Sequence, residues 1–350
     1  MEHFSFEGGH YEMGVRRGRI FRNNKVTFPL HLDTFQREHG EKSEKILRDI
    51  FPEVCEEIRG VSEGAGVSYR ELASWLLCMG CCMYNLEENI PVEIRGCTAF
   101  SCSKDGAVIY GRNNDLPPCL GDGCKSEVYA PRGRNRFQIT TSLFINGEEG
   151  LNEHGLAVAM TFVMTRPEKI RPGLNACFFV RYLLEKADHA EGAVRMLMGL
   201  PVSSNCNILI ADKSGEMAVA ECTPFTKRIR KAIDFGKNRI VCTVNSFISD
   251  EMKPFDASGG NDYDSGKRYR TVMDSFFSHR NGDLIEMAER LLRGEYGFMC
   301  QYDDIPDFET VWSSVYDLNS LRIYRAEGDP RKKKFLTDDR LRDLIAGETP

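Results

Sequence analysis

The stretch of sequence that decides the fold begins at Gly96-Cys97-Thr98 and ends at Gly111-Arg112-Asn113-Asn114-Asp115. Two short runs of strand-forming residues lie between these ends, and they meet at Asp105-Gly106. Asp-Gly favours a two-residue hairpin turn, because both central residues of that turn need a positive φ. We therefore predict a β-hairpin in which Cys97 lies directly opposite Asn114.

Arg112 is expected on the same face of this hairpin as Cys97, because side chains alternate between the two faces of a strand. A neighbouring cation favours the thiolate form of cysteine, and the thiolate is the nucleophile. Asp115 adds a carboxylate close by. The pattern indicates a catalytic thiol, but free cysteine also serves as a small buried hydrophobe. Residue spacing alone leaves both interpretations open.

These residues resemble the penicillin acyltransferase-like cysteine amidohydrolases, which are related to the choloylglycine hydrolases within the N-terminal nucleophile (Ntn) superfamily. In that family a precursor cuts itself just before a cysteine, often in Gly-Cys-Thr. A Gly-Arg-Asn-x-Asp segment follows on the second strand of the hairpin. Here Arg112 and Asp115 stand 15 and 18 residues after Cys97, which fits that layout.

The resemblance continues along most of the chain. Its further segments, in chain order, are 9–14 with Gly18-Arg19, 150–156 as an Asn-Glu-x-Gly-Leu motif, 205–221 as a strand pair, 241–245 as a strand ending in Asn, 265–268 as a Ser-x-x-Arg helix start, and 310–330 as the closing hairpin. One position departs from the pattern, because Ser246 follows Asn245 where relatives often carry His.

The resemblance implies an α+β fold, a four-layer αββα sandwich of the Ntn-hydrolase type. The chain agrees with this, since helices are expected in groups at 43–85, 175–198 and 265–293 while strands dominate the middle, a grouping unlike regular βαβ alternation. Residues 1–96 would form an N-terminal segment, either a propeptide or a small subunit. Residues 97–350 would form the catalytic segment that begins with the nucleophile, and the two together would make one compact domain.

Local signals place the ends of several helices. Pro52 is expected to interrupt or bend a helix over 44–61. Ser68-Tyr69-Arg70-Glu71 is a capping box that opens a helix to about residue 85, before a polar linker at 86–91. Asn175 is expected to cap a helix that ends near Lys186.

The resemblance also implies a role for each site residue. Cys97 would be the nucleophile, and cleavage between Gly96 and Cys97 would free its α-amino group to act as the base. Arg112 would hold the thiolate, Asp115 would orient the amine, and Arg268 would anchor the network. The Asn152 backbone N–H and the Asn245 side-chain amide would form the oxyanion hole. The substrate would be a small-molecule N-acyl amide, and this chemistry needs no metal and no organic cofactor.

Composition and charge exclude other classes of function. A net charge of −6 gives no electrostatic case for nucleic-acid binding, which needs a basic face. The N-terminus lacks the basic and apolar regions of a signal peptide. No apolar run comes near the length of about 20 residues that a membrane-spanning helix needs. Thirteen cysteines without a secretion signal indicate reduced thiols. We therefore expect a cytoplasmic protein that binds neither nucleic acid nor membrane.

Two alternatives deserve weight. A zinc site is unfavourable because most of its candidate thiols lie in a helix pattern rather than in loop knuckles; the candidates are Cys78, Cys81, Cys82, Cys119 and Cys124. The other alternative is a non-catalytic protein that keeps the Ntn fold for binding or structure. The joint presence of the nucleophile, Arg112, Asp115 and both asparagines argues against it, because packing alone does not require that set.

Overall fold

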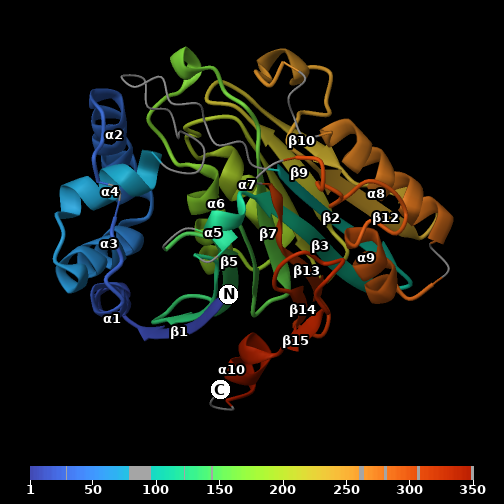
Figure 1. Ribbon diagram of the computed structural model, residues 1–350, viewed down its shortest axis with the longest axis horizontal. Coiled ribbons are helices and arrows are strands. Elements are labelled where there is room, and N and C mark those ends of the chain that lie inside the picture. The colour runs from blue at the N-terminus through green and yellow to red at the C-terminus, as the bar shows by residue number, and fades with distance from the viewer. Residues whose placement is uncertain are drawn as a thin grey trace.

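Two large β-sheets stack face to face, and helices cover both outer surfaces (Figure 1). The computed structural model describes residues 1–28, 30–78, 96–121, 123–142, 145–259, 264–279, 282–305 and 308–347. The arrangement is the αββα sandwich that the sequence predicts. The expected end of the fourth helix, at 79–85, and the linker at 86–91 lie outside the described residues.

The first sheet has eight strands in the order β1-β4-β5-β6-β7-β8-β9-β10. All neighbouring pairs are antiparallel except β1 with β4, which is parallel. The strands are β1 Glu2–Gly8, β4 Lys125–Pro131, β5 Phe137–Thr141, β6 Glu149–Asn152, β7 Leu156–Phe162, β8 Cys206–Asp212, β9 Met217–Cys222 and β10 Lys227–Lys231.

The second sheet has seven strands in the order β11-β12-β2-β3-β13-β14-β15, and all of its pairs are antiparallel. The predicted hairpin β2–β3 therefore sits near the centre of this sheet. The strands are β2 Gly96–Lys104, β3 Ala107–Leu116, β11 Ile233–Phe235, β12 Asn238–Thr243, β13 Glu309–Asp317, β14 Arg322–Ala326 and β15 Leu336–Asp338.

The helices form the two outer layers. α6 and α7 pack on the eight-stranded sheet, with α1–α4 beside them, while α8 and α9 cover the seven-stranded sheet on the opposite side (Figure 1). The helices are α1 His10–Asn23, α2 Thr34–Ile50, α3 Pro52–Ala65, α4 Tyr69–Cys78, α5 Pro118–Gly121, α6 Ala176–Lys186, α7 Ala190–Met198, α8 Ser265–His279, α9 Leu284–Leu292 and α10 Arg340–Ala346.

Three apolar layers hold the sandwich together. One lies between the eight-stranded sheet and its helices, and another lies under α8 and α9. The third fills the space between the two sheets, where Ala99 and Tyr110 meet Leu151 and Leu209. Because burial of apolar area drives folding, this middle layer fixes the spacing of the two sheets from which the site is built.

The two sheets are connected along both of their long sides. On one side only Ala232 separates β10 of the first sheet from β11 of the second. On the other side Gln138 of β5 donates a hydrogen bond to Asp338 of β15 over 2.6 Å. A single linking residue on one side and a hydrogen bond between residues 200 positions apart on the other thus close the sandwich.

The local helix predictions are largely confirmed. α2 ends at Ile50 and α3 begins at Pro52, so proline starts a second helix, where its missing N–H is tolerated. Asn175 caps α6 by accepting from the Phe178 N–H over 3.2 Å. The segment 228–245 holds three strands where two were expected, and α2 begins at Thr34, ahead of the helix group expected from residue 43. The elements that were not predicted are β1, α1, α5, β4, β6, β15 and α10.

Candidate active site

The hairpin places the thiol as the sequence predicts. Cys97 lies opposite Asn114 in the register of β2 and β3. The turn residues Asp105 and Gly106 have φ values of 51° and 87°, so both occupy the left-handed region that an Asp-Gly turn needs. Local turn chemistry thus sets which side chains face Cys97.

Two side chains contact the Cys97 sulfur directly. Arg112 Nη2 lies 3.2 Å from Sγ, and the thiol donates to Asn114 Oδ1 at 3.2 Å. All three residues are fully or almost fully buried. The expected meeting of thiol and guanidinium on one face of the hairpin is therefore present in the structure.

Arg112 is held in place by contacts that reach across to the other sheet. Its Nη1 donates to the Met160 carbonyl at 2.5 Å and to the Glu148 carbonyl at 3.3 Å. Its Nη2 donates to Asn114 Oδ1 at 2.6 Å, and the Glu148 carboxylate lies 3.8 Å away. A guanidinium fixed by so many acceptors presents its charge to the sulfur in one orientation.

Burial opposes ionisation of this thiol in the intact chain. It raises the pKa of Cys97 to about 11, although Arg112 acts in the opposite direction. Burial raises the pKa of three other thiols further, to about 12 for Cys55, Cys242 and Cys300. Of these four thiols, Cys97 ionises most readily, because it has a cation in contact.

The backbone of Cys97 is bound on both sides of its Cα. Its N–H donates to Asn245 Oδ1 over 2.7 Å, and its carbonyl accepts from Arg268 Nη1 over 2.6 Å. Arg268 Nη2 also donates to Asn245 Oδ1 at 2.9 Å. Asn245 Nδ2 in turn donates to the Phe162 carbonyl at 3.0 Å. Asn245 and Arg268 thus hold the two backbone groups of Cys97, its N–H and its carbonyl, and the roles expected for the pair stay predictions.

Asp115 lies beside the peptide bond between Gly96 and Cys97. It is in register with Gly96, and a Cβ placed on Gly96 would stand 3.1 Å from its Oδ2. Tyr302 and Thr310 donate to its two oxygens at 2.8 and 2.6 Å. Burial raises the pKa of Asp115, against the effect of Arg268 and these hydrogen bonds.

The side chain of Asn152 bonds away from the thiol, and the expected role of its backbone N–H in the oxyanion hole stays a prediction. Its Oδ1 accepts from the His154 and Leu156 N–H groups, both at 3.1 Å, within the turn between β6 and β7. Its Nδ2 donates to the Leu184 carbonyl at 3.0 Å. Asn152 organises a turn, a role typical of asparagine.

Several residues near the site were not singled out in the sequence. Asn114 was placed opposite Cys97 but given no role, although its position in the hairpin register was a usable signal. Thr98, Ser265 and Thr310 stand in segments quoted from the sequence but were given no role. Glu148 and Tyr302 come from segments that no local pattern links to the hairpin.

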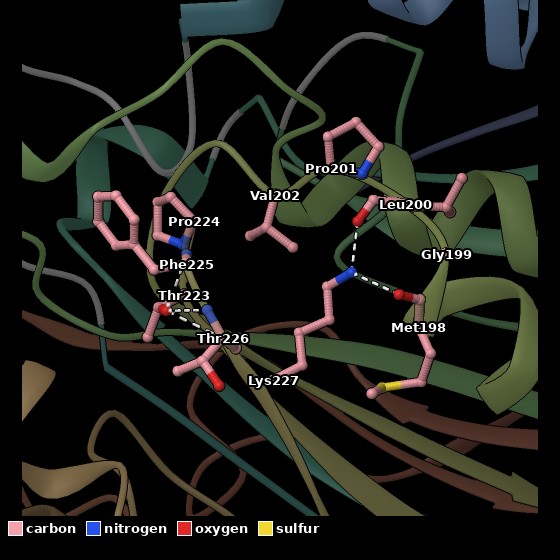
Figure 2. A pocket seen from close by; sticks show the side chains of 10 residues that line it. All are labelled: Met198, Gly199, Leu200, Pro201, Val202, Thr223, Pro224, Phe225, Thr226 and Lys227. Carbon is pink, nitrogen blue, oxygen red and sulfur yellow. Dashed lines mark hydrogen bonds between the residues drawn. The ribbon is translucent and has the colours of Figure 1, made fainter.

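The structure also contains a cavity of about 400 Å³ near the end of α7, shown in Figure 2. Lys227 stands at its wall and donates from Nζ to the carbonyls of Leu197, Met198 and Leu200. These bonds cap the carboxyl end of α7, where a cation is favourable. None of the residues that line this cavity contacts Cys97 or Arg112, so we do not place the chemistry there.

Within the part of the chain that the structure describes, no group of three or more His, Cys, Asp or Glu side chains is arranged to hold a metal ion. Cys81 and Cys82 of the considered zinc site lie outside the described residues. Among the described helices, none is both long enough and apolar enough to cross a membrane.

Comparison with one solved structure, at a TM-score of 0.50, shows the same fold. A variant of conjugated bile acid hydrolase from Clostridium perfringens aligns with a TM-score of 0.50 and 14% sequence identity, over 70% of this chain and 93% of that one. Penicillin V acylase from Agrobacterium tumefaciens aligns with a TM-score of 0.46 and 17% identity, over 66% of this chain and 82% of that one. Comparison with curated protein sequences gives no match.

A family model gives a closer assignment. The model described as acyl-coenzyme A:6-aminopenicillanic acid acyl-transferase matches residues 102–332, about two thirds of the chain. The matched range contains Arg112, Asp115, Asn245 and Arg268, and it begins five residues after Cys97. With the Ntn-hydrolase fold, this match shows an amide hydrolase or acyltransferase of the Ntn type. The chain belongs to the acyl-coenzyme A:6-aminopenicillanic acid acyl-transferase family.

Proposed function

We propose that this protein cleaves amide bonds through a thioester on Cys97, after cutting its own chain between Gly96 and Cys97. Its substrate would be a small-molecule N-acyl amide. One observation carries the proposal: Cys97 has a guanidinium at its sulfur, an asparagine oxygen at its nitrogen and an arginine at its carbonyl. A buried cysteine that served only as packing would need none of these partners.

In the first stage the chain would act on itself. Cys97 Sγ attacks the Gly96 carbonyl carbon, and the bond from that carbon to the Cys97 nitrogen breaks as the nitrogen takes up a proton. The acyl group has then moved from nitrogen to sulfur, and water releases it as the carboxyl end of residue 96. Asp115 borders Gly96, so its carboxyl group lies beside the bond that breaks.

In the second stage the freed α-amino group would serve as the base. Its ordinary pKa of about 7.7–8.0 lets a part of it accept a proton near neutral pH. The amine would take the Cys97 proton, the thiolate would attack the substrate carbonyl, and the leaving amine would receive the proton back. Water or an amine acceptor would then remove the acyl group, giving hydrolysis or acyl transfer.

The remaining site residues would support this cycle from their present positions. Arg112 would stabilise the thiolate at 3.2 Å, and Asp115 would orient the new amine. Asn245 would keep its oxygen toward that nitrogen while Arg268 fixes the Asn245 oxygen. In the original resemblance Asn245 is also an oxyanion donor, and its variants test that role.

We further propose that residues 1–96 stay bound after cleavage as a small subunit. Strand β1 pairs with β4 of the catalytic segment over seven residues. Buried ion pairs also cross between the two pieces: Arg17 lies 2.5 Å from Glu127, and Arg181 lies 2.7 Å from Glu57. Separation would expose these charges and an apolar layer, which is unfavourable.

A cytoplasmic location is part of the same proposal. Thirteen cysteines in 350 residues favour a compartment that keeps thiols reduced. The catalytic thiol needs such a compartment as well, because oxidation would remove the nucleophile.

The test combines intact mass with a matched pair of cysteine variants. The purified protein should yield two fragments that split at Gly96/Cys97 in place of one species of 39.7 kDa. Cys97→Ala should abolish both cleavage and turnover on a panel of N-acyl p-nitroanilides. Cys102→Ala is the control, because Cys102 is buried on the same strand but faces the layer under α8 and α9.

Two results would contradict the proposal. An uncleaved chain with full amidase activity would exclude the Ntn mechanism, and an active Cys97→Ala variant would exclude the nucleophile. A single intact species without activity on any amide would favour the non-catalytic alternative.

A further inference from the structure

One polar group at the site has no use in the mechanism described so far. Asn114 is fully buried, and its Oδ1 accepts from the Cys97 thiol at 3.2 Å and from Arg112 Nη2 at 2.6 Å. Arginine can only donate, so the atom that faces it must be the amide oxygen. Asn114 Nδ2 is buried and has no hydrogen-bond partner in the described structure.

The neighbouring residue shows what a structural asparagine looks like on this strand. Asn113 is also fully buried, but it faces the other side of the sheet. Its Nδ2 donates to the Leu292 carbonyl at 3.0 Å, and its Oδ1 accepts from Ser313 Oγ at 2.7 Å. Most buried polar atoms in proteins are paired in this way, so the unpaired Nδ2 of Asn114 beside a nucleophile calls for an explanation.

We infer that Asn114 Nδ2 donates to the oxyanion that forms when Cys97 attacks an amide carbonyl. This role rests on the proposed function of Cys97. As the bond from sulfur to carbon forms, the carbonyl π electrons move onto oxygen, and Nδ2–H stabilises that charge. As the oxyanion collapses, the bond from carbon to nitrogen breaks, and the leaving nitrogen carries away the proton that the thiol gave up.

The positions of the atoms fit this role. The oxyanion lies two bonds from Sγ, and Nδ2 shares a carbon with the Oδ1 atom that is 3.2 Å from Sγ. An effective donor stands about 2.7–3.1 Å from the developing charge. A donor at the position of Nδ2 can come this close to the oxyanion. Before the reaction the donor has no partner to give up, which is what a preorganised oxyanion hole requires.

The other expected donors leave room for Asn114. Asn152 lies at the far end of β6 and organises a turn. Asn245 uses its Nδ2 on the Phe162 carbonyl at 3.0 Å and its oxygen on the Cys97 N–H. Of these three asparagines, only Asn114 has an amide nitrogen that is unpaired.

The test uses two variants at 114 and one at 113. Asn114→Leu removes the donor with little change in volume, and Asn114→Asp replaces the donor with an acceptor at the same shape. Each should slow self-cleavage and lower kcat on N-acyl p-nitroanilides by about 100-fold or more, as the loss of one oxyanion donor does elsewhere. KM should change little, because the interaction forms only in the transition state.

The control measurements separate this role from packing. Asn113→Asp, which loses its bond to the Leu292 carbonyl, should lower the melting temperature but leave kcat of the folded protein unchanged. Alkylation of Cys97 by iodoacetamide forms no oxyanion, so on the uncleaved chain, compared in the Gly96→Ala background, Asn114→Leu should retain its rate within about threefold. A parallel loss of alkylation and turnover would instead mean that Asn114 acts only on the thiol, which overturns the proposal.

The remaining outcomes also decide the question. If either folded Asn114 variant cleaves itself and turns over within about threefold of the wild type, the donor role is wrong. If Asn114→Leu does not fold, Asn114→Asp decides alone, since it keeps the shape and the acceptor for Arg112. An active Cys97→Ala variant would overturn the proposed function itself, whatever the Asn114 variants show.

Discussion

Replacing Arg112 with methionine should make Cys97 much less reactive. Arg112 Nη2 lies 3.2 Å from the sulfur, and among the charged groups around Cys97 it lowers the thiol pKa most. Unit charges at this distance interact by about 5 kcal/mol at an effective dielectric constant of about 20, and this energy is an upper limit for the effect of Arg112 on the thiolate. An adjacent opposite charge commonly shifts a pKa by about 1–3 units. Below the pKa each unit changes the thiolate population about tenfold, so alkylation should slow by about 10- to 1,000-fold.

The assay is alkylation by iodoacetamide between pH 7 and 11, followed by mass spectrometry. Both proteins carry Gly96→Ala, which slows self-cleavage, so that the uncleaved species of 39.7 kDa is compared in each case. With Arg112 present the rate should rise through this range toward a midpoint near pH 11, and the rate for Arg112→Met should still be lower at pH 11 because its midpoint lies higher. Arg325→Met is the control, since Arg325 is also buried and ion-paired but contacts Asp338 outside the site.

A second variant removes the effect of lost stability. Without Arg112 the buried Glu148 carboxylate loses a cation 3.8 Å away, and breaking a buried pair costs about 3–5 kcal/mol. Arg112→Met combined with Glu148→Gln restores the charge balance and should recover most of the melting temperature. Because Glu148 itself raises the pKa of Cys97, part of the alkylation rate should also return. An unchanged rate and midpoint in Arg112→Met would refute a role for this guanidinium in stabilising the thiolate.

Three further outcomes are expected. Gly96→Ala should slow self-cleavage, measured by gel over time, by about tenfold or more. The added Cβ would stand 3.0 Å from Asp115 Cβ, and a small displacement of reacting groups lowers a reaction rate strongly. Cleavage at the normal rate would show that the absence of a side chain at residue 96 is not needed. Asn245→Ala should lower kcat by about 100-fold. If the amide nitrogen of Asn245 is a donor, Asn245→Asp should be equally slow. An active Asn245→Asp would instead reduce the role of Asn245 to that of an acceptor for the Cys97 N–H. Burial opposes ionisation of Glu53, but hydrogen bonds from its own backbone and from two basic side chains lower its pKa from 4.5 to about 2. The contribution of Glu53 to stability is therefore present above pH 4.5 and is lost as pH falls toward 2. Glu53→Gln should flatten the dependence of the melting temperature on pH across that range, and an unchanged acid profile would argue against this linkage.

The sequence predicted the hairpin well because its information is local. An Asp-Gly turn fixes the register by itself, and the register alone placed Cys97, Arg112 and Asn114 on one face. The same holds for the break at Pro52, where one residue without an N–H determines the boundary between two helices.

The motif around Asn152 leaves the role of this residue open. A segment of the form Asn-Glu-x-Gly-Leu serves equally well as a turn between two strands, and here its asparagine accepts two backbone N–H groups of that turn. Nothing in the local sequence tells which end of the strand faces the nucleophile. That depends on how the second sheet is stacked on the first.

The partners of the site came from too far away to be inferred. Tyr302 reaches Asp115 across 187 positions, and Met160 reaches Arg112 across 48. The parallel strand β1 could not be foreseen either, because parallel pairing carries no local turn signal.

The closed edges of the sandwich have a mechanical consequence for the reaction. The thiol and the guanidinium belong to one sheet, while the carbonyl groups of Met160 and Glu148 that aim the guanidinium belong to the other sheet or the loop that enters it. Sliding of one sheet over the other would therefore pull the charge away from the sulfur. The single residue Ala232 on one side and the Gln138–Asp338 bond on the other resist such shear. The frame would thus hold the thiol and the guanidinium in alignment during the proposed reaction.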